Sequence, residues 1–470
     1  MLGAVSGERR PRMPRWAMNA NLAPHDAAGA SDTVDPLQSL WMPFTSNRYF
    51  KAHPRLIASA SGAYYTLSNQ QRVFDCLSGL WCTPLGHAHP RIMRAVQEQV
   101  GRLDFSPSFQ LGHQPAFDLA RRIAELAERP KDRVFLVNSG SEAVDTALKI
   151  AIGYHRIRGE ASRTRIIGRE RGYHGVGLGG ISVGGIAANR KMFAPLMIAG
   201  VDHLPHTYSA KDMRFSRGQP QWGAHLADEL ERLVALHDAS TIAAVIVEPV
   251  QGSTGVIVPP HGYLERLREI SAKHGILLIF DEVITGFGRL GKPFAAQCLG
   301  VQPDLTTFAK AVTNGCVPMG GVLAGEHIYD TFMSGPEQAI EFFHGYTYSG
   351  HPLAVAAAHA ALDGLVGERQ IERAASLAPI LENAVHTLRG EPHVIDIRNF
   401  GLTAAVELES IAGQPGVRGR RMFERGFEEG LLLRVTSDSI SLAPPFISTP
   451  EEILAMIEGL RRALRALASA

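Results

Sequence analysis

The sequence predicts an α/β protein, with a mainly parallel sheet in a large domain and a smaller α+β domain. Between about residues 130 and 325, short apolar runs alternate with amphipathic helix patterns. That alternation is typical of parallel strands covered by helices on both faces. After about Ser349 the pattern changes to a long alanine-rich helix, further helix and short strands. At 470 residues the chain is long enough for two domains.

The N-terminal part is expected to be a tail followed by a short helix and strands. Residues 1–35 carry arginines but no long apolar run, so we predict a disordered tail and not a secretory signal. A start at Met18 and an amphipathic transit peptide stay open. Order is expected from Pro36, and "GAYYTLSNQQRVFDCLSGL" has β-rich ends around a turn. We predict that residues 36–85 join the small domain, 86–348 form the large domain and 349–470 the C-terminal small domain.

The large domain opens with two predicted amphipathic helices and continues as strand–helix units. The helices are "HPRIMRAVQEQVGRL" and "QPAFDLARRIAELAER". The units then run in the order strand "DRVFLVNSG", helix "SEAVDTALKIAIGYHRIRG", strand "TRIIGRERGYHG", strand "IAAVIVEPV", helix "HGYLERLREISAKHG", strand "ILLIFDEV" and strand "MGGVLAG". In the C-terminal part, the predicted elements are helix "HPLAVAAAHAALDGLVGE", strands "HVIDIRNFG", "TAAVELE" and "SISLAPP", and a closing helix.

Composition excludes several classes of function. The net charge of +1 gives no reason to expect nucleic acid or an anionic membrane as partner, and no stretch approaches the ~18 apolar residues of a membrane span. The four cysteines show no CxxC spacing, which favours reduced thiols and a cytoplasmic protein. No metal site is predicted. Only eight of the 47 basic residues are lysines, so candidates for a reactive amine are few.

Polar residues follow four of the predicted strands, in "NSGSE", "RGYHG", "EPVQG" and "FDEV". Ligands of open parallel sheets bind at the carboxyl ends of strands. Ser139, Gly140 and Ser141 follow a strand and open a helix, where backbone amides and the helix dipole favour an anion. Ser139 and Glu142 also fit an ordinary capping box, which any helix can carry.

Two residues at the other strand ends, Tyr173 and Asp281, point to a flat, charged cofactor. Tyr173, between two glycines, could stack on a planar ring, although a packed turn tyrosine fits as well; Arg171 and His174 also fit ordinary loop residues. Asp281 continues a buried strand, and a buried carboxylate is costly unless it is paired. The protonated ring nitrogen of pyridoxal phosphate is a suitable partner. The alternative for Asp281 is a helix or turn cap.

The reactive amine is expected at Lys310. Lys310 ends an apolar stretch and precedes a glycine-rich loop, 29 positions after Asp281. A lysine desolvated there would have a lowered pKa and serve as nucleophile and base. Lys149, inside the helix after "NSGS", is the second choice, because its neighbours Leu148 and Ile150 suggest a partly buried stem.

Several segments carry a resemblance to a known family, the class III aminotransferases, which are fold type I pyridoxal-phosphate enzymes. These segments are "VNSGSEAVDTALKIA", "RGYHG", "VEPVQG", "LLIFDEVITGFGRLG", "PDLTTFAKAVTNGCVPMGG" and "HGYTYSGHP". "LWMPFTSNRYF", "LSGLW", "VDHLPHTY" and "VIDIRNFG" are similar to the ω-amino acid–pyruvate branch, to which the β-alanine–pyruvate enzymes belong. The resemblance runs from about Leu40 to the C-terminus and covers all but the first 35 or so residues.

The resemblance implies a role for each matching residue. Lys310 forms the Schiff base, Asp281 pairs with the pyridine nitrogen and Tyr173 stacks on the ring. The further residues expected around the cofactor are Ser139, Gly140, Ser141, His174, Glu248, Gln251 and Val283. Thr347 is expected to reach the cofactor phosphate of the other subunit, which implies a homodimer or homotetramer with shared active sites. The substrate pocket is expected to contain Phe44, Leu80, Trp81 and the movable Arg434, which takes the substrate carboxylate.

The predicted function is therefore a pyridoxal-phosphate-dependent, ping-pong transamination. The amino group of an ω-amino acid or amine, with β-alanine as the first choice, would pass to pyruvate and give alanine; β-alanine would give malonate semialdehyde. Taurine, 4-aminobutyrate, a polyamine or an aryl-alkyl amine are alternative donors, and an aminomutase is an alternative reaction. A non-catalytic pyridoxal-phosphate-binding protein is the alternative outside the enzymes.

Overall fold

A seven-stranded sheet forms the centre of the computed structural model, which describes residues 35–468. The predicted tail lies outside these residues except for Asp35, which caps the first helix, and so does Met18. The sheet has the strand order β4-β10-β9-β8-β7-β5-β6. Its strands are β4 (Arg133–Val137), β10 (Gly320–Ala324), β9 (Leu305–Phe308), β8 (Leu277–Asp281), β7 (Ile242–Val247), β5 (Arg165–Arg169) and β6 (Val201–Leu204).

The expected mainly parallel sheet is confirmed. The ladders between β9, β8, β7, β5 and β6 are all parallel, whereas β10 is antiparallel to both of its neighbours. Alternate residues along a strand point to opposite faces, and β7 and β8 are apolar at every position except the terminal Asp281. The sheet is therefore buried on both faces, as the continuous apolar runs of the sequence indicate.

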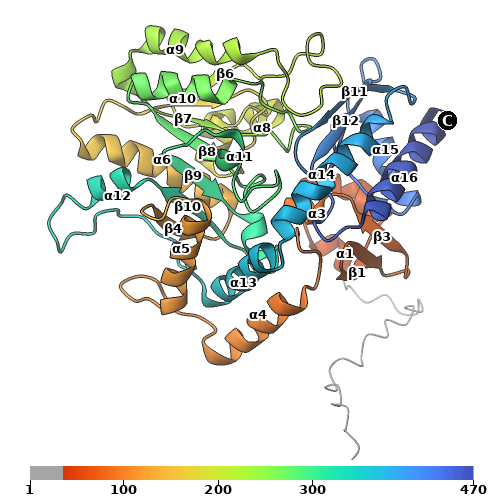
Figure 1. Ribbon diagram of the computed structural model, residues 1–470, viewed down its shortest axis with the longest axis horizontal. Helices are drawn as coiled ribbons and strands as arrows, with labels where there is room; N and C mark the ends of the chain where they lie inside the picture. Colours follow the sequence, from red (N-terminus) through yellow and green to blue (C-terminus); the bar gives the residue numbers. More distant parts are fainter. Residues whose placement is uncertain (1–34, 469–470) are drawn as a thin grey trace, which may run out of the picture. The chain divides into compact units, whose positions relative to one another are not determined.

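Helices cover both faces of this sheet (Figure 1). On one face, Ile246 and Ile279 pack in a cluster with α6 (Gly140–Ile157) and α12 (Glu326–Phe332). On the other face, Val247 and Phe280 pack with α9 (Glu229–His237) and α10 (Tyr263–Lys273). The remaining helices of this part are α4 (Pro90–Arg102), α5 (Gln114–Leu126), α7 (Leu178–Val183), α8 (Ala187–Phe193) and α11 (Ala295–Leu299).

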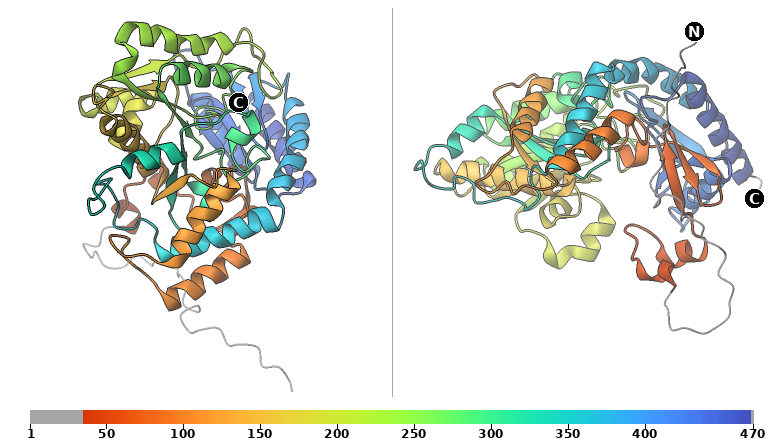
Figure 2. Two further views of the ribbon diagram at one scale, coloured as in Figure 1. Left: turned by 60° about the vertical axis from the view of Figure 1, so that its left-hand side comes forward. Right: turned by 90° about the horizontal axis from the view of Figure 1, so that it is seen from below.

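Two four-stranded sheets lie outside the central sheet. One joins distant parts of the chain, because β3 pairs in parallel with β13; it contains β1 (Ile57–Ser61), β2 (Tyr64–Leu67), β3 (Arg72–Asp75) and β13 (Leu431–Leu432). Figure 2 shows these early strands beside the C-terminal helix. The other sheet contains β11 (Val394–Asn399), β12 (Ala404–Leu408), β15 (Ser439–Leu442) and β14 (Arg434–Thr436), and the helices here are α13 (Pro352–Leu362), α14 (Gln370–His386), α15 (Val417–Glu428) and α16 (Pro450–Ala468).

Residues 35–55 belong to a separate compact unit. It contains the short helices α1 (Pro36–Ser39) and α2 (Asn47–Ala52). Asn47 organises the loop between them, because its side chain accepts a hydrogen bond from the amide of Met42 and donates to the carbonyls of Met42 and Thr45. Within residues 35–468, no helix is both long and apolar enough to cross a membrane.

Candidate functional site

A cavity lies at the carboxyl ends of the central strands, where the sequence places its ligand-binding residues. It is lined by Gly140, Ser141, Tyr173, His174, Gly175, Glu248, Asp281, Val283, Ile284 and Lys310. Apart from Gly175 and Ile284, all of these residues are candidates from the sequence. Chain reversals after β4, β5, β7, β8 and β9 bring them together, as expected for an open sheet whose strands end at one edge.

The N-terminus of α6 forms one wall of the cavity. Ser139 caps this helix, since its Oγ accepts a hydrogen bond from the Glu142 amide at 3.1 Å. The capping role foreseen as the alternative for Ser139 is thus present. The first amides of a helix have no partner within it, and those of Gly140 and Ser141 open onto the cavity. This 18-residue helix therefore offers an anion site at its positive end.

Glycines keep that wall open. A Cβ on Gly140 would lie 3.0 Å from Cγ1 of Val283. A Cβ on Gly175 would lie 2.3 Å from Oγ of Ser141, and the φ of Gly175 is +85°, a conformation that side chains disfavour. The Ser141 hydroxyl also accepts the Val176 amide at 3.0 Å. Without side chains at Gly140 and Gly175, a small bound group could approach the backbone of this wall closely.

Asp281 ends β8 and is 5% exposed. The protein itself supplies three donors to this carboxylate: the Val283 amide at 3.1 Å and the Thr307 hydroxyl at 3.2 Å to Oδ1, and His174 Nδ1 at 2.7 Å to Oδ2. The burial of Asp281 is therefore compensated in part within the protein, as a buried charge requires. Because Asp281 lines the cavity, its carboxylate is also available to a cationic group of a ligand.

A second buried carboxylate, Glu248, fixes the aromatic residue of the cavity. Its Oε1 accepts the amide of Tyr173 at 2.8 Å. Burial, aided by the nearby charge of Asp281, raises the pKa of Glu248 to about 7. The backbone of Tyr173 is thus fixed at the cavity by a hydrogen bond to Glu248, the residue that follows β7.

Lys310 lies two residues after the end of β9, with Ala309 between them, and begins a short 3₁₀ turn. Its φ of +49° lies in the left-handed region, a strain of about 1–3 kcal/mol that persists only where the surroundings impose it. Burial lowers the pKa of its amine. Lys149, the second choice in the sequence, is exposed and does not line the cavity.

Trp81 lies beside Lys310, outside the lining of the cavity, and Leu80 precedes it in the chain. The Lys310 Nζ atom lies 5.5 Å from the centroid of the Trp81 ring, and Trp81 is buried whereas Leu80 is 52% exposed. Arg434, at the start of β14, is exposed. Burial raises the pKa of Tyr173 and lowers that of Lys310, and the charge of Arg434 lowers both. Arg434 is thus near enough to act on the site.

Seven candidates from the sequence do not line this cavity: Ser139, Leu80, Trp81 and Arg434, described above, and Gln251, Thr347 and Phe44. Gln251 is buried, and its side-chain amide donates to the carbonyl of Glu170 at 2.9 Å. Thr347 is exposed on the loop before α13. Phe44, in the separate unit of residues 35–55, is 71% exposed. The roles of these residues remain predictions.

Conversely, the structure adds Thr307, Gly175 and Ile284 to the site. Thr307 lies directly opposite Asp281 in the ladder between β8 and β9. A polar pair, Thr306 and Thr307, in an otherwise apolar strand was a signal for it in the sequence. The register that places Thr307 beside Asp281 was not readable from the chain.

The residues of the cavity fit pyridoxal phosphate, group by group. Helix amides and the Ser141 hydroxyl suit its phosphate, the carboxylate of Asp281 its ring nitrogen, and the amine of Lys310 its aldehyde. Tyr173 and Val283 provide an aromatic and an aliphatic surface for a flat ring. The glycine contacts described above show that a larger side chain at Gly140 or Gly175 would reduce the room available.

Glu282, next to Asp281, faces away from the cavity and caps α11. Its carboxylate accepts the amides of Ala295 and Ala296 and the hydroxyl of Thr285. Burial raises its pKa from 4.5 to about 7. The unfolded chain therefore loses this proton at lower pH than the folded protein does, so Glu282 reduces stability as the pH rises from 4.5 to 7.

We expect Glu282→Gln to remove that pH dependence. Relative to the variant, the wild type should lose about 3 kcal/mol of unfolding free energy between pH 4.5 and 7. Urea unfolding at several pH values, followed by circular dichroism, measures the difference. A difference between the two proteins that stays constant across this range would contradict the raised pKa.

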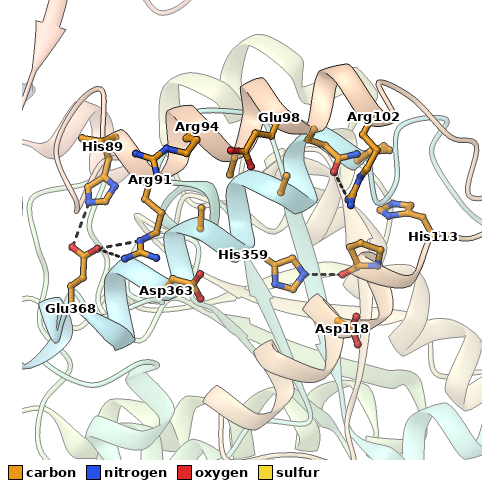
Figure 3. A pocket seen from close by; sticks show the side chains of 17 residues that line it. His89, Arg91, Arg94, Glu98, Arg102, His113, Asp118, His359, Asp363 and Glu368 are labelled. Atoms are coloured by element: carbon orange, nitrogen blue, oxygen red, sulfur yellow. Dashed lines mark hydrogen bonds and ion pairs between the residues drawn. The ribbon is translucent and has the colours of Figure 1, made fainter. Parts of the chain in front are cut away.

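A larger groove, of about 1060 Å³, lies between α4 and α13. Figure 3 shows its mixed lining, in which Glu368 pairs with Arg91 and His89. Cationic and acidic side chains alternate along it, and none of the candidates from the sequence lines it. Size alone therefore does not identify the site; the chemistry of the smaller cavity does.

Comparison with known proteins agrees with this chemistry. The model of the Aminotransferase class-III family matches residues 45–464. The chain is 56% identical over 436 residues to an omega-aminotransferase of Caulobacter vibrioides, covering 93% of this chain and 98% of that protein. It is 50% identical over 435 residues to a beta-alanine–pyruvate aminotransferase of Pseudomonas aeruginosa, covering 92% and 96%. An amine transaminase from an uncultivated Pseudomonas species, solved in its PLP-bound form, has a TM-score of 0.85 at 36% identity, covering 91% and 98%.

Proposed function

Because the chain belongs to the class III aminotransferases, whose cofactor is pyridoxal phosphate, we propose that it transfers the amino group of an ω-amino acid to pyruvate. β-Alanine is the donor that we favour, giving malonate semialdehyde, and alanine is the second product. The high identity to an omega-aminotransferase and to a beta-alanine–pyruvate aminotransferase supports this choice. The two half-reactions would follow one another in a ping-pong order.

The cavity residues divide into those that hold the cofactor and those that act on the substrate. Gly140 and Ser141 would hold the phosphate at the start of α6, and Tyr173 and Val283 would enclose the ring. The amine of Lys310 would hold the cofactor's aldehyde carbon. Four further residues would hold the surrounding backbone and Asp281 in place through hydrogen bonds: Ser139, His174, Glu248 and Gln251.

Pyridoxal phosphate supplies an electron sink for the pair released when a C–H bond next to nitrogen breaks. Asp281 keeps a negative charge at the place where a protonated ring nitrogen would lie, so that this charge is available without rearrangement. Lys310, with its pKa lowered by burial, is suited to take a proton from the substrate carbon and to return one. Positioned acid–base work of this kind contributes about 10²–10⁴-fold in rate.

One observation carries this proposal: a desolvated lysine and a buried aspartate line the same cavity at the end of a parallel sheet. The test is a half-reaction. Purified protein with its bound cofactor would be mixed with β-alanine alone and its visible absorbance followed, before pyruvate is added. We expect bleaching with β-alanine and recovery with pyruvate, with malonate semialdehyde and alanine formed in turn.

Other results of this experiment distinguish the alternatives. Bleaching with taurine, 4-aminobutyrate, a polyamine or an aryl-alkyl amine, but not with β-alanine, would keep the reaction and change the donor. Return of the amino group to the same carbon skeleton without pyruvate would indicate an aminomutase. A bound chromophore that responds to no amine would indicate a cofactor-binding protein without transaminase activity.

Arg434→Ala is expected to separate carboxylate substrates from apolar amines. An exposed, long arginine can turn toward a carboxylate and away from an apolar group. Loss of its charged hydrogen bonds should lower kcat/KM for β-alanine and pyruvate by about 10- to 100-fold, through KM, and leave an aryl-alkyl amine nearly unchanged. Steady-state kinetics on both donors measures this.

The matched control is Arg421→Ala, since Arg421 is an exposed arginine on the neighbouring α15. This variant should behave as wild type. Equal losses with carboxylate and apolar donors in Arg434→Ala would remove the arginine from substrate binding.

We further propose a homodimer or homotetramer in which Thr347 reaches the cofactor phosphate of a second subunit. The exposed apolar side chains of Phe109, Leu111, Phe343 and Tyr348 support an interface at the loops before α5 and α13. Phe44 would complete the substrate pocket. Residues 86–348 would then form the large domain, with 36–85 and 349–470 in the small one. A monomer in analytical ultracentrifugation of the active protein would contradict the shared site.

A further inference from the structure

Trp81 stands on a turn of unusual backbone geometry. Ser78, Gly79, Leu80 and Trp81 have φ angles of +48°, +53°, +67° and +62°. Four successive residues are thus left-handed, and three of them carry side chains, although L-residues visit this region as single positions and not as runs. A conformation of this kind persists only where surrounding contacts over-determine it. The contacts that do so come from three separate segments.

Asp75 holds the entry to the turn. Its Oδ1 accepts the Leu77 amide at 3.1 Å and its Oδ2 the Gly79 amide at 2.6 Å. The same Oδ2 lies 2.8 Å from Nε2 of His87, beyond the exit of the turn. Asp75 is 1% exposed, so this carboxylate joins both ends of the turn without competition from solvent.

Arg289 holds the middle of the turn. Its Nη2 donates to Oγ of Ser78 at 3.1 Å, and its Nη1 donates to the carbonyls of Leu402 and Pro444. The Ser78 hydroxyl in turn donates to the Ala443 carbonyl at 2.7 Å. Arg289 is buried and forms no close ion pair with a carboxylate among the residues that the structure describes, although the charge of Asp75 raises its pKa against the lowering by burial, and its guanidinium lies 4.7 Å from the centroid of the Phe446 ring. Burying a cation is costly, so an arginine that donates its hydrogen bonds to two backbone carbonyls and one hydroxyl indicates that the position of these segments must be fixed.

Asn314 holds the exit. Its Oδ1 accepts the Leu85 amide at 2.8 Å and its Nδ2 donates to the Gly86 carbonyl at 2.8 Å. Asn314 follows Lys310 by four positions, and Arg289 follows Asp281 by eight. Of the two loops that begin with the proposed catalytic residues, one therefore binds the turn that carries Trp81 and the other binds the segment that follows it.

We propose that Asp75, Arg289 and Asn314 are positioning residues, which clamp the turn Ser78–Trp81 and so fix the Trp81 ring beside Lys310. This inference rests on the proposed function, because the fixed ring would then limit the size of the amino donor and keep water from the amine. The 5.5 Å separation between Nζ and the ring centroid is the distance that the clamp maintains. None of the three residues needs to touch substrate for this role.

The test compares Arg289→Met and Asn314→Gly with the wild-type holoenzyme. Glycine suits position 314, where φ is +53°, so only the amide contacts are lost. Placement errors of about 1 Å can cost 10²-fold in rate. We expect the ratio of kcat/KM for β-alanine to that for 1-phenylethylamine to fall by about tenfold or more in each variant. Arg289→Lys should recover part of the ratio, because an ammonium keeps the charge but cannot reach all three acceptors.

A second readout does not depend on turnover. A displaced Trp81 would admit water to Lys310, so the pH midpoint of the bound cofactor's absorbance change should rise in both variants. Arg373→Met is the matched control, because Arg373 donates to the carbonyls of Phe446 and Ser448 in the adjoining segment but does not contact the turn. It should lower the melting temperature and leave the ratio and the midpoint unchanged.

The inference is overturned if Arg289→Met and Asn314→Gly lower only the melting temperature, as the control does. Should Arg289→Met fail to fold, Ser78→Ala removes the bond from Arg289 to the turn with the loss of one atom, and the same expectations apply. If the wild type responds to no amine at all, the proposed function fails, while the absorbance midpoint still decides whether the clamp holds Trp81.

Discussion

Lys310→Ala is expected to lower turnover by about 10⁴-fold or more and to abolish the visible absorbance that the lysine–cofactor link produces. Lys310 is the one lysine that lines the cavity among the described residues, and its amine combines the roles of attachment point and proton carrier. Borohydride reduction of the wild type followed by peptide mass spectrometry should locate the cofactor on Lys310. In the variant, cofactor bound by its phosphate should be removable by dialysis.

Lys149→Ala is the control for this substitution. Lys149 lies on α6, the helix that begins at the cavity, but its side chain is exposed. This variant should keep wild-type turnover and absorbance. Normal turnover in Lys310→Ala, or cofactor attached to another lysine, would exclude the proposed site.

The sequence predicted those parts of the fold and site that local patterns determine. β7 and β8 are continuous apolar runs, and their ends are marked by Glu248 and Asp281, so their burial and the position of the cavity followed directly. Lys310 was distinguishable from Lys149 because it ends an apolar stretch and precedes a glycine-rich loop. In contrast, the helical period around Lys149 did not tell which face that residue occupies.

Features that depend on long-range register were not predictable. β10 was expected as a strand, but nothing in "MGGVLAG" shows that it runs antiparallel to β4 and β9. The edge strand β6 was missed, because it is four residues long and contains Asp202 and His203. The left-handed turn at Ser78–Trp81 was hidden as well, since its hydrogen bonds to Arg289, far along the chain, leave no local pattern in the sequence.

Asp281→Asn is expected to lower kcat by about 10²–10³-fold while the fold is kept. The amide is the same size as the carboxylate, and its oxygen can still accept the Val283 amide and the Thr307 hydroxyl. What is lost is the negative charge that would keep a ring nitrogen protonated, so the electron sink weakens. Stopped-flow absorbance with β-alanine would show slow bleaching by a protein that has a nearly normal melting temperature.

Glu282→Gln makes the same chemical change one residue along the chain, and this comparison isolates the cause. Both side chains are buried and both accept backbone amides, but Asp281 lines the cavity and Glu282 caps α11. If charge at the cavity drives the reaction, Glu282→Gln alters the pH dependence of stability and keeps kcat, whereas Asp281→Asn lowers kcat. Equal losses of kcat in the two variants would mean that the strand end acts through packing, and Asp281 would then lose its place in the proposed reaction.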